Sequence, residues 1–190
     1  MTDDRNLHDD LSYVRTVLDR AESGDNPAII YFLWAAISFI GFSMIDFFPK
    51  QTGLYWVIAG PAGGVLSGVL GWRAGRALGQ SSRREGRLHG LHWSGLMGAI
   101  VLLVPLVATH QLPTETIPRL ILLLVAFSYF AAGVHMDRRL LWVGLALGGC
   151  YLFTVFEVGL PYLWTITAAL LSASLVIAGF FAMARARRVI

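Results

Sequence analysis

The chain has 190 residues, of which 56% are hydrophobic and only 14% are charged, and its mean hydropathy is +0.62. Soluble domains carry about 25% charged residues, so this composition excludes an ordinary water-soluble fold and predicts a protein that uses lipid as its solvent. The formal net charge is +3, and the arginines cluster beside apolar runs, which indicates membrane topology and argues against nucleic-acid binding.

Residues 1–26 are polar and acidic, with seven Asp or Glu against three Arg. We expect them to form a short cytoplasmic amphipathic helix in front of a transmembrane domain at residues 27–190. An apolar seam recurs within residues 7–21 at spacings of three and four, which places its members on one face of the helix: Leu7, Leu11, Val14 and Leu18. The seam predicts docking on the protein's own basic surface, binding to a membrane or cytosolic partner, or contact with the lipid surface.

Six apolar segments follow, each long enough to cross a bilayer. The predicted spans are residues 27–48, 53–72, 89–108, 117–136, 140–158 and 162–183. Thirteen of the 15 Lys and Arg residues fall on one side of this arrangement, and only Lys50 and Arg119 fall on the other. The positive-inside rule therefore places both termini in the cytoplasm. The fold class that follows is all-α: a polytopic, multi-pass protein of a bacterial-type inner (plasma) membrane.

The second span is rich in glycine. Small residues recur four apart on two of its faces, namely Gly60, Gly64 and Gly68 on one and Gly63, Ser67, Gly71 and Gly75 on the other. In lipid, such faces let two helix backbones approach closely. We expect this helix to be surrounded by others, within the monomer or in a homo-oligomer, with a weak point at Pro61. Lining a pathway is a third interpretation.

A polar connection with five arginines follows the second span: Arg73, Arg76, Arg83, Arg84 and Arg87. These arginines fix the topology and are candidates for contacts with anionic headgroups of the lipid bilayer.

Ionisable residues cluster near the outer ends of the spans. Asp46 and Glu157 end the first and fifth spans, and the connection before the fourth span and the start of that span contribute His110, Glu115 and Arg119. Acids at membrane depth are costly and often functional. If the helices bring these five residues together, they form an acidic outer vestibule for a cation or proton. The alternative is that all five are interfacial and solvated.

Sequence motifs for chemistry are not found. There is no H-E-x-x-H motif and no Walker loop, so we expect no enzyme activity, no catalytic residue, no cofactor and no metal site. His92 and His135 would form a ligand pair only if antiparallel neighbours held them at one depth.

Two functions remain from the sequence. The first is a small channel or transporter for an ion or solute, with the acidic vestibule as its entrance. The second is a non-transporting accessory or regulatory membrane protein that recruits a partner through its N-terminal seam.

Overall fold

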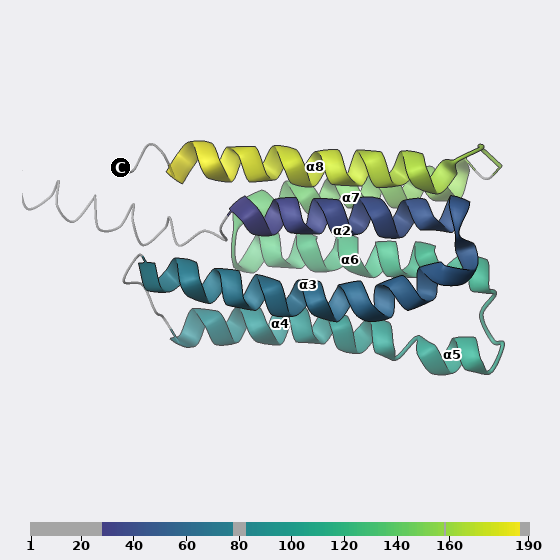
Figure 1. Ribbon diagram of the computed structural model, residues 1–190, viewed down its shortest axis with the longest axis horizontal. Helices are drawn as coiled ribbons and strands as arrows, with labels where there is room; N and C mark the ends of the chain where they lie inside the picture. The colour runs from purple at the N-terminus through teal and green to yellow at the C-terminus, as the bar shows by residue number, and fades with distance from the viewer. Residues whose placement is uncertain (1–27, 78–82, 158, 187–190) are drawn as a thin grey trace, which may run out of the picture.

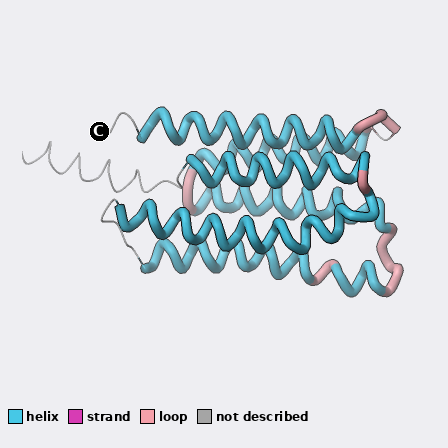
Figure 2. Tube along the Cα trace, in the orientation of Figure 1, coloured by secondary structure: helices cyan, strands magenta, loops and turns pink. Residues whose placement is uncertain are grey.

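The computed structural model describes residues 28–77, 83–157 and 159–186, which form helices joined by short turns (Figure 1). The helices are α2 (Ala28–Phe47), α3 (Pro49–Ala77), α4 (Arg83–Val101), α5 (Val104–Ala108), the 3-10 helix η1 (Thr114–Thr116), α6 (Ile117–His135), α7 (Arg138–Phe156) and α8 (Leu163–Ala186). Six segments are long and apolar enough to cross a membrane, with α4 and α5 counted as one. The predicted six-helix, all-α architecture is confirmed, and the described ranges contain no strand (Figure 2). The N-terminal seam lies outside the described residues.

Prolines set two of the helix boundaries. Pro49 starts α3 at a position where its missing N–H costs nothing, so residues 49–52, which lie between the first two predicted spans, are already helical. Pro105 divides the third span, because without an N–H it cannot bond to the carbonyl of Val101, where α4 ends. In contrast, α3 runs through Pro61 without interruption.

Two antiparallel helix pairs make the most extensive contacts of the described chain: α2 with α8, and α6 with α7. Contacts between α7 and α8 join the pairs into a four-helix core, while α3 packs on α2 and α4 packs on α6 at its edges (Figure 1). The helix connections gather at two ends. We call one the basic end, because it carries Arg73, Arg76, Arg87, Arg138 and Arg139. The opposite end carries α5, η1 and the α2–α3 and α7–α8 connections.

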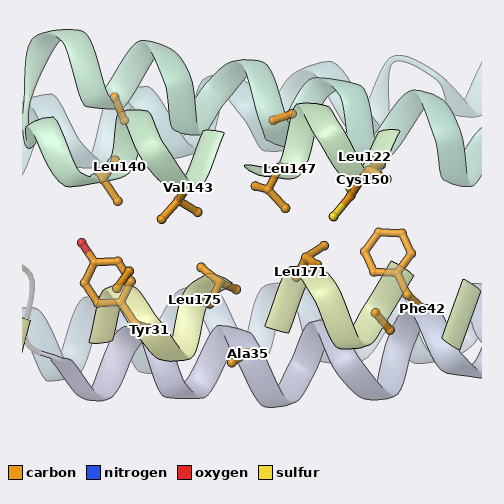
Figure 3. Packing of buried hydrophobic residues seen from close by; sticks show 14 of the residues in the cluster. Tyr31, Ala35, Phe42, Leu122, Leu140, Val143, Leu147, Cys150, Leu171 and Leu175 are labelled. Carbon is orange, nitrogen blue, oxygen red and sulfur yellow. The ribbon is translucent and has the colours of Figure 1, made fainter. Parts of the chain in front are cut away.

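Apolar side chains fill the space between the two pairs. Figure 3 shows Leu140, Val143 and Leu147 of α7 pointing toward Leu171 and Leu175 of α8. All five are buried. In lipid there is no hydrophobic drive between helices, so their association depends on van der Waals packing of this kind. The filled interior therefore holds the two pairs together.

Polar side chains in this core bond to backbone carbonyls. The Thr167 hydroxyl donates to the carbonyl one turn earlier in its own helix, at 2.8 Å. The Ser172 hydroxyl of α8 donates across the pair to the carbonyl of Ala35 in α2, at 2.9 Å. Because these hydroxyls are paired within the protein, they avoid the cost of an unsatisfied group in an apolar medium.

Glycines bring α6 and α7 into close backbone contact. A Cβ on Gly133 of α6 would overlap the backbone of Leu141, and a Cβ on Gly144 of α7 would overlap the backbone of Phe130. Each helix thus presents a glycine to the main chain of the other, which is the geometry that small residues permit in membranes. Neither glycine belongs to the small-residue faces predicted from the sequence.

The glycine-rich helix α3 lies at the edge of the bundle. Gly63 packs against the side chains of Ile37 and Trp34, and Trp34 Nε1 donates to Ser67 Oγ at 3.0 Å. By contrast, an added Cβ would meet no atom within 4 Å at Gly60, Gly64, Gly68 or Gly71; Gly75 is half-buried. Among the described helices α3 therefore packs mainly on α2, and the expectation that it is surrounded, within the monomer or in a homo-oligomer, stays a prediction. The following helix, α4, packs on α6.

Candidate functional site

Asp46 lies in the last turn of α2 and is half-buried. Its Oδ2 accepts two hydrogen bonds from Thr165 of α8, one from the backbone N–H and one from the hydroxyl, both at 2.7 Å. Thr165 is the third residue of α8, and the N–H groups of a helix's first turn have no partner within the helix. A carboxylate is also favourable at the positive end of the helix dipole. Asp46 therefore caps α8 from the neighbouring helix.

Arg119 makes the complementary contact at the end of α7. Its Nε donates to the carbonyl oxygen of Thr154 at 3.1 Å, and this carbonyl belongs to the last turn of α7. The guanidinium carbon lies 5.8 Å from the centre of the Trp164 ring. Carbonyls of the last helical turn lack intrahelical partners, and a cation is favourable there. Arg119 thus caps α7 from α6.

These two caps lie on either side of the α7–α8 connection. Asp46 and Arg119 are each held at a helix end, whereas His110, Glu115 and Glu157 are exposed. In the part of the chain that the structure describes, no hydrogen bond or ion pair joins the side chains of these five residues. The role of this set as an ion or proton vestibule stays a prediction.

At the basic end, Asp137 caps its own helix and also contacts a second one. Asp137 precedes α7, and its Oδ1 accepts the backbone N–H of Arg139 at 3.0 Å. Its Oδ2 lies 3.5 Å from the hydroxyl of Tyr31 in α2, which ties the α6–α7 turn to the other helix pair.

The arginines predicted to face headgroups are exposed where their side chains are described. Arg73, Arg76 and Arg87 are exposed, and the guanidinium carbon of Arg76 lies 4.4 Å from the centre of the Trp72 ring. Arg83 and Arg84 begin α4, and their side chains lie outside the described part.

The two histidines are not at one depth. His92 Nε2 lies 3.0 Å from the carbonyl oxygen of Ser128, and His135 is seven residues further along α6, which is about 10 Å along a helix axis. Beside His92, the ring of Trp93 packs edge-on against Tyr129 with centroids 5.1 Å apart. Within the described ranges, no three His, Cys, Asp or Glu residues are grouped to hold a metal ion.

Sequence reasoning missed Thr165, Thr154 and Asp137. Asp137 carries a local signal, because an Asp directly before an apolar helix is a favoured N-cap. Thr165 and the Thr154 carbonyl carry no such signal, since their partners lie in other helices.

A shallow apolar groove lies elsewhere, on α8 toward the basic end. It is lined by Ile177, Phe180, Phe181 and Ala184. Ile177 is 12 residues from Thr165, or about 18 Å along the helix, so the groove is separate from the helix caps.

No protein-family model matches this sequence, and neither a curated protein nor a solved structure matches it.

Proposed function

We propose that this chain is a non-transporting accessory membrane protein, whose bundle is an anchor and whose N-terminal seam recruits a membrane or cytosolic partner. The observation that carries the proposal is the role of Asp46. Asp46 is one of the five residues of the predicted ion pathway, and its carboxylate makes two short hydrogen bonds that cap α8. The apolar core and its hydroxyls, which are hydrogen-bonded within the protein, add support because they form a packed interior.

The charge distribution supports an orientation for this role. The basic end would face the cytoplasm by the positive-inside rule, in an inner (plasma) membrane. The seam would then lie on the cytoplasmic side, where soluble partners and the cytoplasmic parts of membrane partners are accessible.

The recruitment hypothesis is tested by disrupting the seam in the full chain. The double substitution Leu11→Asp and Leu18→Asp places two negative charges on the apolar face, whereas Thr16→Asp adds one negative charge off that face. After crosslinking, proteins that co-purify with wild type and with Thr16→Asp should be lost from the double variant. An unchanged set of partners in the double variant, or an equal loss in Thr16→Asp, would contradict the proposal.

Transport remains a second candidate, favoured by one observation beside Asp46. The hydroxyl of Ser43, one turn earlier on α2, is buried and has no hydrogen-bond partner in the described chain. An ion path is expected to have a polar group deeper in the membrane than the acid at its entrance.

Flux measurements in liposomes separate an ion-binding Asp46 from a capping one. Asp46→Asn removes the charge, whereas Thr165→Val breaks part of the same contact and keeps the acid. Under the transport hypothesis, wild type and Thr165→Val conduct and Asp46→Asn does not. If wild type gives no protein-dependent flux over a panel of ions and protons, transport is rejected.

A further inference from the structure

An exposed strip runs along the half of α3 nearer the basic end. Val65, Val69, Trp72 and Arg76 are all exposed, and their spacing of four, three and four residues places them on one helix face. The exposed fraction is 68% for Val65 and 59% for Trp72. From Val65 to Arg76 the helix rises about 16 Å, close to half of the roughly 30 Å hydrocarbon core of a bilayer. The strip therefore spans about one leaflet, from apolar to cationic.

The cationic end of the strip carries arginine donors that no described residue accepts. Trp72 lies under the Arg76 guanidinium at 4.4 Å, a cation–π contact that restrains the side chain and leaves its in-plane N–H groups available. Arg73 is exposed on the same turn. Neither arginine forms a hydrogen bond or an ion pair with a described residue. The planar donor arrangement of arginine matches the oxygens of a phosphate group.

We propose that this strip binds an anionic glycerophospholipid of the leaflet at the basic end. Its phosphate pairs with Arg73 and Arg76, its glycerol region lies against Trp72, and an acyl chain follows Val69 and Val65. The space beside the strip is open, because an added Cβ on Gly68 would meet no atom within 4 Å. A free phosphate would use only the arginines and would gain nothing from the apolar part, which is why the structure favours a lipid.

Native mass spectrometry of the detergent-purified full chain tests the proposal. The protein is incubated with equal amounts of phosphatidylglycerol and phosphatidylcholine, and the ratio of the two retained lipids is measured. Each arginine near an anionic headgroup contributes about a fivefold preference, so Arg73→Gln with Arg76→Gln should lower the ratio about 25-fold. Arg138→Gln removes one positive charge from an exposed site at the basic end but on α7, and it should change the ratio less than twofold, against about fivefold for each arginine of the strip. Trp72→Leu should reduce retention about threefold while the arginines remain.

Several results would overturn the proposal. One is an unchanged ratio in the double variant, and another is an equal fall in Arg138→Gln, which would indicate only a diffuse positive surface. Complete displacement of phosphatidylglycerol by equimolar inorganic phosphate would indicate a simple anion site. Binding that appears only after residues 1–22 are deleted would show that the acidic segment occupies the arginines. A lipid-free dimer as the dominant species would assign the strip to a second copy. The unfolding midpoint of the double variant is measured as a control for folding. It should match that of wild type because both arginines are exposed.

Discussion

The cap that Asp46 places on α8 predicts a specific loss of stability. Asp46→Ala removes both hydrogen bonds to Thr165 and leaves an N–H of the first helical turn without a partner. A hydrogen bond to a charged group contributes about 1.5–3 kcal/mol, and an N-cap about 0.5–2 kcal/mol, so we expect Asp46→Ala to lower the free energy of unfolding by about 3 kcal/mol. Asp46→Asn retains an acceptor oxygen without the charge and should cost about half as much.

Thr165→Val makes the prediction sharper, because it removes the hydroxyl donor and keeps the backbone N–H. We expect it to cost about 1 kcal/mol. The double variant Asp46→Ala with Thr165→Val should cost less than the sum of the single changes, with a coupling energy of about 1 kcal/mol.

The assay is equilibrium unfolding in mixed micelles with increasing SDS, followed by tryptophan fluorescence. Glu157→Ala is the matched control, since this carboxylate is exposed at the end of α7, and it should stay within about 0.5 kcal/mol of wild type. An Asp46→Ala variant as stable as Glu157→Ala would refute the capping role, and so would strict additivity in the double variant.

Two further changes probe the helix contacts. Gly144→Ala should lower the free energy of unfolding by about 1–3 kcal/mol, because its Cβ would overlap the backbone of α6; Gly148→Ala, one turn along with open space around it, should raise it by about 0.5–1 kcal/mol. The same SDS titration measures both, and equal effects would contradict close packing at Gly144. Arg119→Gln should lower the free energy of unfolding by about 1–2 kcal/mol, because the charged hydrogen bond to the Thr154 carbonyl is lost. Lys50→Gln, at an exposed site of the same end, should leave this free energy unchanged. If Arg119→Gln also leaves it unchanged, this cap contributes nothing to stability.

The number of spans could be predicted because the signal is local. A run of about 20 apolar residues is readable wherever it occurs, and prolines mark the positions where an N–H is missing. Even so, proline has different effects at two positions. The break between α4 and α5 lies just before Pro105, whereas α3 continues through Pro61.

The packing partners could not be predicted, because helix adjacency in the chain does not determine adjacency in space. The glycines of α3 gave the stronger pattern, yet the backbone contact forms at Gly133 and Gly144. A small residue permits close approach but cannot specify which helix will approach it. Only the packing of α6 against α7 determines which glycines make the backbone contact.

The candidate site illustrates the same limit. The cost of an acid near the membrane singles out Asp46 in the sequence, but its capping contact depends on Thr165, which is 119 residues away in the sequence. The charge of Asp46 is visible in the sequence, whereas its partner is a property of the fold.

The pairing of α2 with α8 has a consequence for biogenesis. Membrane segments emerge from the ribosome in order, and α2 is made long before α8 is available. Until α8 is inserted, the face of α2 with Tyr31, Ala35 and Phe42 lacks its neighbour, and Asp46 lacks Thr165. The α6–α7 hairpin, in contrast, can close as soon as it is synthesised, because its contacts are between adjacent segments. The contacts of the four-helix core are therefore complete only once α8 is available.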